Sequence, residues 1–175
     1  MKTISILGVA VLLLISCKSI PLEAKLDPQT NYLYADNRDI EVITKISFAK
    51  DSLKHLLIVP NEAHLEVGKT LNFFNEVMTR DQFEDAIIKA GFVDDVETFR
   101  NRKSQHKAAV VYRPFVILEQ FYEGSSFEGL RLYDPIGERI IFENKMGTQI
   151  FGVYPDIRRL FPLYNSLLDY LRKQH

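Results

Sequence analysis

Cysteine is almost absent from this sequence. The 175 residues include one cysteine, Cys17, so no disulfide can form within the chain. A domain of this length does not require disulfides, because it can bury a hydrophobic core of its own. Cys17 is therefore either an unpaired, reactive thiol or a site of covalent modification.

Long hydrophobic runs are also missing. The longest apolar stretch, Ile4–Ile15, spans 12 residues, whereas a membrane-spanning helix needs roughly 20. Lys2 precedes this stretch, and Ser16, a small residue, follows it. A positive charge, a short apolar region and a small residue in this order are typical of a secretory signal. We therefore expect an exported protein without a transmembrane span.

Cys17 stands directly behind that signal. The tetrapeptide Leu14-Ile15-Ser16-Cys17 resembles the lipobox of bacterial lipoproteins. The resemblance implies that residues 1–16 are a signal peptide, that the chain is cut between Ser16 and Cys17, and that Cys17 receives acyl chains on its thiol and its new amine. Two or three acyl chains fix a protein firmly, since each buried methylene contributes about 0.8 kcal/mol. The alternative is an ordinary signal peptide with an incidental cysteine.

The lipoprotein resemblance carries further expectations. A mature chain whose one cysteine is acylated can have neither thiol catalysis nor a thiolate metal site. Lys18 follows the modified cysteine, and in lipoproteins that resemble this one a residue other than aspartate there favours the outer membrane. We therefore expect a protein of the cell envelope, anchored to the membrane through acyl chains on Cys17.

An excess of charge of either sign is lacking as well. The net charge is −1, and loss of residues 1–16 removes Lys2 and no acidic residue, which leaves −2. This balance argues against a nucleic-acid partner. Gly68-Lys69-Thr70 resembles the end of a phosphate-binding loop, but position 63, which requires glycine, is Ala63. We expect no nucleotide, no metal and no other cofactor.

The chain divides into a short leader, a tether and one domain. Residues 17–38 are expected to form the lipidated cysteine and a flexible tether, because Pro21, Pro28 and scattered polar residues disfavour regular structure. About 20 flexible residues reach roughly 25 Å. Tyr32, Leu33 and Tyr34 are apolar enough for the end of the tether to dock on the domain. The remaining residues, 39–175, are expected to form a single domain.

The hydrophobic pattern of that domain predicts an α/β (α+β) fold. Alternating or short apolar segments predict strands at residues 40–48, 56–59, 115–121, 130–134 and 140–142. Helical spacing and end signals predict helices at residues 67–78, 80–90, 94–109 and 161–173. We expect a mixed β-sheet with helices packed on it, ending in an amphipathic C-terminal helix.

This order of elements resembles the small α/β domains of periplasmic lipoproteins related to curli secretion and to the N-terminal domain of the Tol-Pal β-propeller. The residues that carry the resemblance are Leu57-Ile58-Val59-Pro60, the turn Tyr133-Asp134-Pro135-Ile136-Gly137 with the following Arg139-Ile140-Ile141-Phe142, and the final helix. Such domains mostly serve as assembly and interaction modules. The resemblance thus implies a non-catalytic role.

Catalytic and metal-binding patterns are weak. Glu62, His64 and Glu66 alternate and would share one face of a strand, which suits a metal, but we expect this segment to be a polar loop. The tract Gly124-Ser125-Ser126 does not match the Gly-x-Ser-x-Gly elbow and is expected to be a turn. The alternative function is an envelope hydrolase with a dispersed active site. A deep polar pocket with converging Asp, His or Ser side chains would favour the hydrolase.

The densest basic cluster contains Arg100, Arg102, Lys103 and Lys107. On a helix, Arg100, Lys103 and Lys107 would share one face. A solvated helix face that balances the preceding acidic residues accounts for this cluster, and the functional alternative is contact with anionic lipid headgroups or an acidic partner. Taken with the lipobox, the sequence predicts a lipid-anchored envelope protein that acts as a non-catalytic binding or assembly module with a protein partner in the envelope.

Overall fold

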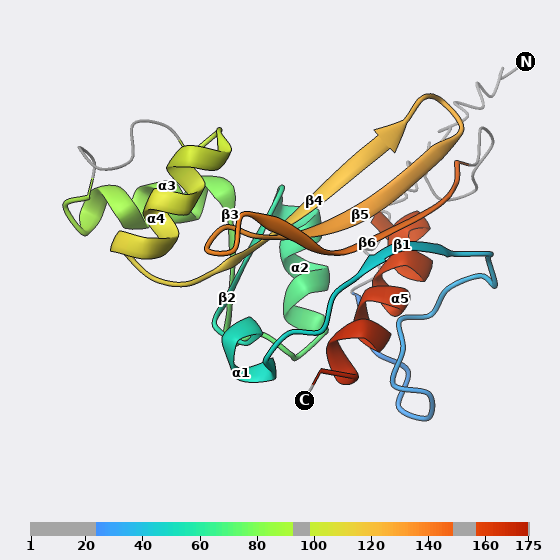
Figure 1. Ribbon diagram of the computed structural model, residues 1–175. Helices are drawn as coiled ribbons and strands as arrows, with labels where there is room; N and C mark the ends of the chain where they lie inside the picture. The colour runs from blue at the N-terminus through green and yellow to red at the C-terminus, as the bar shows by residue number, and fades with distance from the viewer. Residues whose placement is uncertain (1–23, 93–98, 149–156, 175) are drawn as a thin grey trace, which may run out of the picture.

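The computed structural model describes residues 24–92, 99–148 and 157–174 (Figure 1). In these ranges the strands are β1 (Glu41–Lys45), β2 (Leu56–Val59), β3 (Glu76–Thr79), β4 (Val116–Glu123), β5 (Phe127–Asp134) and β6 (Arg139–Gly147). The helices are α1 (Lys50–Leu53), α2 (Glu62–Thr70), α3 (Arg80–Lys89), α4 (Arg102–Val111) and α5 (Phe161–Arg172), with the 3-10 helix η2 (Ile157–Leu160) before α5. The predicted α/β fold with a C-terminal helix is confirmed.

All six strands belong to one mixed sheet, in the order β1-β6-β5-β4-β2-β3. β2 is parallel to β3 and β4, and the remaining pairs are antiparallel. Each residue of β2 is buried, as predicted for a short apolar strand that is covered on both faces. The hairpin of β5 and β6 has the predicted pairing, with Leu132 opposite Phe142.

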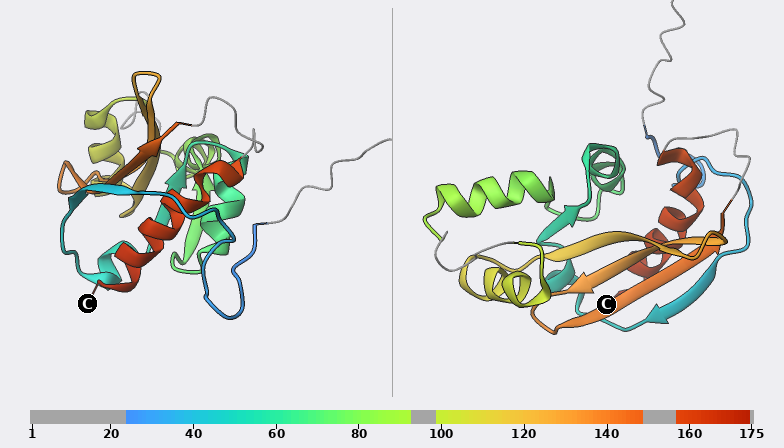
Figure 2. Two further views of the ribbon diagram at one scale, coloured as in Figure 1. Left: turned by 90° about the vertical axis from the view of Figure 1, so that its right-hand side faces the viewer. Right: turned by 90° about the horizontal axis from the view of Figure 1, so that it is seen from above.

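The sheet separates two apolar layers. On one face, α2 and α5 pack against alternate residues of the strands, among them Leu57 and Leu132. On the other face, α3 and α4 pack against Leu56, Ile58 and Ile117. These two helices lie over the β2–β3–β4 end of the sheet. The outer parts of β5 and β6, together with β1, have α5 on one face and no described helix on the other (Figure 2).

The predicted end signals of two helices are present. Thr79 and Gln82 form a capping box: the Thr79 hydroxyl accepts from the Gln82 amide at 3.2 Å, and Gln82 Oε1 accepts from the Thr79 amide at 3.1 Å. Gly91 follows α3 with a φ of 81°, a conformation that favours glycine. Pro162 lies in the first turn of α5, where its missing amide hydrogen is not needed.

The predicted helix over residues 67–78 is wrong at both ends. α2 begins five residues earlier, because the side chain of Asn61 accepts a hydrogen bond from the His64 amide at 3.2 Å and caps the helix. Asn72, with a φ of 50°, turns the chain just after the helix. The chain then enters β3, where Val77 is buried and β2 supplies the backbone partners.

The first strand is shorter and more exposed than predicted. β1 occupies five of the nine residues expected for it and lies at the edge of the sheet. Val42 and Ile43 are nearly half exposed, and the register shifts between Val42 and Thr44. The half-buried strand that alternation predicted is therefore an edge strand.

The predicted helix over 94–109 also differs. α4 begins at Arg102, because the Asn101 side chain accepts a hydrogen bond from the Ser104 amide at 2.8 Å. The acidic residues 94, 95 and 97, which were expected to open the helix, lie outside the described residues.

Candidate functional site

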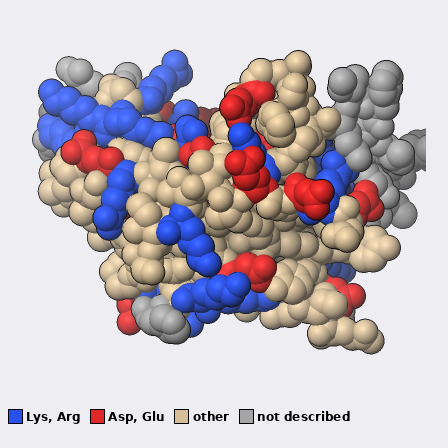
Figure 3. All heavy atoms as spheres, turned by 45° about the vertical axis from the view of Figure 1, so that its right-hand side comes forward, with Lys and Arg blue, Asp and Glu red and all other residues tan. Residues whose placement is uncertain are grey.

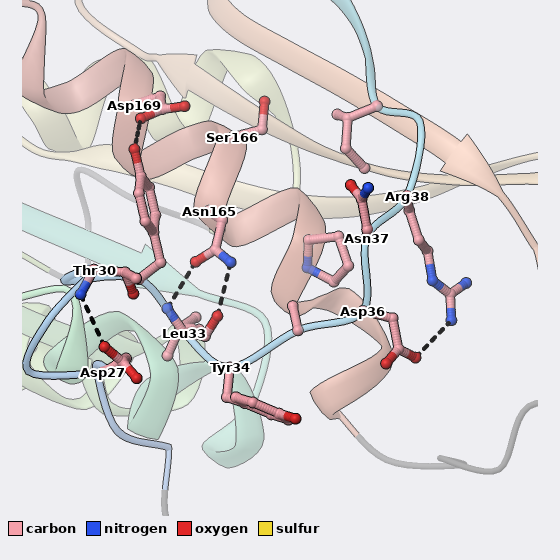
Figure 4. A pocket seen from close by; sticks show the side chains of 14 residues that line it. Asp27, Thr30, Leu33, Tyr34, Asp36, Asn37, Arg38, Asn165, Ser166 and Asp169 are labelled. Carbon is pink, nitrogen blue, oxygen red and sulfur yellow. Dashed lines mark hydrogen bonds and ion pairs between the residues drawn. The ribbon is translucent and has the colours of Figure 1, made fainter.

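The chain before β1 is fastened to α5, and Figure 4 shows this attachment. Leu33 is only 2% exposed. The Leu33 amide donates to Oδ1 of Asn165, and Nδ2 of Asn165 donates to the Leu33 carbonyl, each at 2.8 Å. One side chain thus satisfies both backbone groups of a buried residue, as a neighbouring strand would.

Two further sets of contacts fix the same segment. The Tyr32 hydroxyl donates to Asp169 of α5 at 2.5 Å, and this hydrogen bond raises the pKa of Tyr32. The Ala24 amide donates to Glu66 of α2, and the Thr70 hydroxyl donates to the Ala24 carbonyl, both at 3.0 Å. The segment is therefore bound to both helices that cover this face of the sheet.

These contacts correct the expected tether. Residues 24–38 pack on α2 and α5, whereas the sequence predicts a flexible tether over 17–38 of which only the end, at Tyr32, Leu33 and Tyr34, could dock on the domain. The partners lie far along the chain, since Leu33 and Asn165 are 132 residues apart, and Pro21 and Pro28 indicate only local irregularity. Cys17 and the rest of the expected tether lie outside the described residues.

An open groove of about 740 Å³ lies between this segment and α5 (Figure 4). Its acidic groups already have partners: Asp27 accepts from the amides of Gln29 and Thr30, and Asp169 accepts from Tyr32. The two backbone amides lower the pKa of Asp27. Asp27 and Asp169 therefore stabilise the fold of the groove through their hydrogen bonds.

The uncovered part of the sheet carries paired charges. We define the open sheet face as Glu41, Glu119, Phe121, Glu123, Phe127, Arg131, Glu143 and Lys145. The close nitrogen–oxygen pairs are Arg102–Glu119 at 2.7 Å, Arg131–Glu143 at 2.7 Å and Lys145–Glu123 at 2.8 Å. The hydrogen bond to Glu143 raises the pKa of Arg131, and the one to Glu123 raises that of Lys145.

Each of these three cations also lies over an aromatic ring. The guanidinium carbon of Arg102 is 3.6 Å from the centroid of Tyr133, that of Arg131 is 4.6 Å from Phe121, and the Lys145 ammonium is 4.9 Å from Phe127. An acid and a ring together restrict each long side chain. The open sheet face is thus an ordered surface on which acidic and basic groups alternate. Such a surface suits a partner with complementary charges.

The structure separates the predicted basic cluster. Arg100 precedes the cap of α4 and so does not share a helix face with Lys103 and Lys107, and Arg102 belongs to the ion pairs of the open sheet face. Lys103, Lys107 and Val110 are exposed at positions i, i+4 and i+7 of α4. They form the α4 stripe. Figure 3 shows Lys and Arg side chains gathered on the side of the molecule that carries α3 and α4.

Behind the sheet, His64 takes part in a chain of side-chain hydrogen bonds. The Tyr164 hydroxyl lies 2.5 Å from Nδ1 of His64, and Nε2 lies 3.2 Å from Oε1 of Gln120. Because an amide oxygen only accepts, Nε2 carries the hydrogen and Nδ1 accepts from Tyr164. Nε2 of Gln120 then donates to the Tyr122 hydroxyl at 2.7 Å, and Arg159 donates to the same hydroxyl at 3.1 Å.

The buried contact between His64 and Tyr164 favours the neutral form of both side chains. Burial lowers the pKa of His64 and raises that of Tyr164 well above its ordinary value. His64 is 1% exposed and Tyr164 is fully buried, and both ring nitrogens of the histidine are engaged. The pair therefore joins α2 to α5 and does not face solvent as a catalytic dyad would.

We expect stability to fall as the pH drops below about 6.5, the ordinary pKa of histidine. Since the folded pKa of His64 lies below that value, the unfolded chain binds more protons between the two, and stability is lost across this interval by up to about 1.4 kcal/mol per pH unit. The free energy of unfolding is measured at pH 7.5 and 5.5. His64→Gln should show a smaller decrease than wild type, and His55→Gln, at an exposed histidine, the same decrease. If all three proteins lost the same stability between pH 7.5 and 5.5, the protonation of His64 would not be the cause.

The predicted polar loop with Glu62, His64 and Glu66 is a helix instead. The three residues lie on α2, and Glu62 accepts from Gln82 while Glu66 accepts from the Ala24 amide. In the described ranges, no group of three or more His, Cys, Asp or Glu side chains is close enough to bind one metal ion.

Gly68-Lys69-Thr70 is the last turn of α2 rather than a loop or the start of a helix. A Cβ at Gly68 would meet Val77 at 2.9 Å and Leu57 at 3.3 Å. The glycine therefore allows α2 to approach β2 and β3 closely, and this contact accounts for it without a phosphate.

A smaller pocket contains the residue types of a hydrolase. A cavity of about 220 Å³ at the β5–β6 turn is lined in part by Ser52, His55 and Asp134. A nucleophile and its base must lie within hydrogen-bond reach. In the part of the chain that the structure describes, no hydrogen bond joins these three side chains. The pocket gathers the groups but does not arrange them as a triad.

Comparisons with models of protein families, with curated proteins and with solved structures find no match to this chain. The likeness to small α/β envelope lipoprotein domains and the lipobox therefore stay predictions. Across residues 24–92, 99–148 and 157–174, none of the helices has the length and apolar character to cross a bilayer. The structure is an α/β domain whose N-terminal segment, residues 24–38, is hydrogen-bonded to α2 and α5. Its open sheet face carries both acidic and basic side chains, and the α4 stripe is exposed.

Proposed function

We propose that this chain is a protein of the bacterial cell envelope, anchored to the membrane through acyl chains on Cys17, and that it acts as a non-catalytic binding or assembly module. Its partner would be a protein that contacts the open sheet face and the α4 stripe. The observation that carries the proposal is the attachment of residues 24–38 to α2 and α5, on the face of the sheet opposite α4.

The argument for orientation rests on the length of chain between anchor and domain. Seven residues, 17–23, lie between the start of the expected mature chain and Ala24, and they span at most about 25 Å when extended. A lipid on Cys17 would therefore keep the α2–α5 face near the membrane. The open sheet face and the α4 stripe would then point away from it, toward a protein rather than toward lipid headgroups.

The chemistry of the exposed surface supports a protein partner. Lys103 and Lys107 suit acidic groups, Val110 is 61% exposed, and the neighbouring sheet offers both signs of charge. Charge complementarity of this kind selects a partner and its register. A hydrolase would have to use the pocket with Ser52 and His55. These two side chains would first have to come within hydrogen-bond distance of each other.

Site-specific photo-crosslinking in intact cells tests the proposed contact surface. A benzophenone amino acid is placed at Val110 on α4, at Phe127 on the open sheet face, or at Tyr34 on the anchor side, where the side chain is 85% exposed. We expect one protein adduct of the same mass from Val110 and Phe127, and none of that mass from Tyr34. Adducts from Tyr34 alone, or from none of the three, would contradict the proposal.

A further inference from the structure

The pocket at the β5–β6 turn has walls from several separate segments. Phe48 comes from the connection before α1, Phe115 and Val116 from the start of β4, and Ile136 from the turn. Phe115 and Val116 are 3% exposed, so the floor of the pocket is continuous with the core. A volume of about 220 Å³ equals that of about seven water molecules and lies below the roughly 300 Å³ at which pockets for drug-sized ligands begin.

The acidic group of this pocket is Asp134. Its side chain is 7% exposed, and Oδ1 accepts from the Ile136 amide at 3.1 Å. Oδ2 lies 3.9 Å from Nε of Arg139, beyond hydrogen-bond distance, and the Arg139 guanidinium lies over the ring of Phe48 at 5.7 Å. In the described part of the chain the carboxylate thus has one hydrogen bond, although it can accept about four.

The ion pair with Arg139 offsets part of the cost of burying this carboxylate, and most of its acceptor positions have no hydrogen bond from the described residues. Five of the eight lining residues are apolar, and Ser52 and His55, which also line the pocket, are exposed residues. A ligand that fits must therefore be small, have a compact apolar body and donate hydrogen bonds from a positive group.

We propose that this pocket binds a small organic amine: a ring or branched alkyl group against Phe48, Phe115 and Ile136, and a protonated amino group that donates to Asp134. This site uses no residue of the open sheet face or the α4 stripe. It therefore does not depend on the proposed function, and either can fail without the other.

The test uses methyl NMR of the mature protein in detergent micelles, titrated with benzylamine. Benzyl alcohol serves as the probe of similar shape without the charge. Methyl signals of Ile136 and Val116 report on the pocket. Ile88, which is 56% exposed on α3, reports on nonspecific effects. We expect saturable shifts at Ile136 and Val116 with benzylamine, no matching shift at Ile88, and affinity for benzyl alcohol at least about tenfold lower.

Three variants make the test specific. Asp134→Asn keeps an acceptor for the Ile136 amide and should weaken benzylamine binding by at least about tenfold. Asp51→Asn, at a 99% exposed carboxylate of α1, makes the same charge change and should have no effect. Ser52→Tyr places a ring at the exposed side of the pocket and should abolish binding with the fold intact. The proposal is overturned by the absence of saturable shifts, by equal affinity for the two probes, or by unchanged binding in Asp134→Asn or Ser52→Tyr.

Discussion

Leu33→Ala should lower the free energy of unfolding by about 2–5 kcal/mol, the usual range for a buried leucine. Leu33 lies before the first strand, in a segment that the sequence assigned to a flexible tether, yet it is 2% exposed in the core formed with α5. Truncation to alanine leaves a cavity in this core. The hydrogen bonds between Asn165 and the backbone of residue 33 hold the segment in place, so the segment does not move to fill the cavity. Equilibrium denaturation with urea measures the change.

The adjacent residue provides a matched control. Tyr34 is 85% exposed, so Tyr34→Ala should change the free energy of unfolding by less than about 0.5 kcal/mol. A chain that begins at Asp39 lacks Leu33 altogether and should be destabilised in the same direction. If Leu33→Ala is as stable as Tyr34→Ala, residues 24–38 do not belong to the folded domain.

Cys17→Ser should leave the protein unprocessed and unlipidated. In proteins with a lipobox, acylation requires the thiol and precedes cleavage, and a serine hydroxyl does not replace it. Without acyl chains the contribution of about 0.8 kcal/mol per buried methylene is lost. Metabolic labelling with a fatty-acid analogue, followed by fractionation, measures both effects.

Ser16→Ala is the control for this prediction, because alanine keeps a small residue before the cysteine. It should retain the label and the membrane location. Label retained on Cys17→Ser would show that the acyl chain, if any, is attached elsewhere, and the lipobox interpretation would be wrong.

Local signals predicted local structure well. The continuous apolar run of β2 predicted a central strand, and Thr79 and Gln82 predicted the start of α3, because both depend on residues close together in the chain. Helix α2 begins earlier than its apolar spacing predicts because Asn61 caps it, and an asparagine at this position is an ordinary start signal. The strand β3 depends on β2 for its partners and had no comparable local signal.

Contacts between residues far apart in the chain could not be predicted from the sequence pattern. Nothing near Leu33 indicates a partner as distant as Asn165. Arg102 was grouped with its basic neighbours in sequence, whereas its closest charged partner, Glu119, lies on a strand. The alternation of Glu119, Phe121 and Glu123 along β4 is a local signal for an uncovered sheet face.

The orientation of the domain is tested most directly with a photoactivatable phospholipid. The mature protein is placed in vesicles that contain this lipid, illuminated and digested, and the labelled peptides are identified by mass spectrometry. We expect label on Cys17 peptides and on residues 24–38, with little on α4 or on the hairpin of β4 and β5. Label concentrated on α4 and the open sheet face, with residues 24–38 unlabelled, would contradict it.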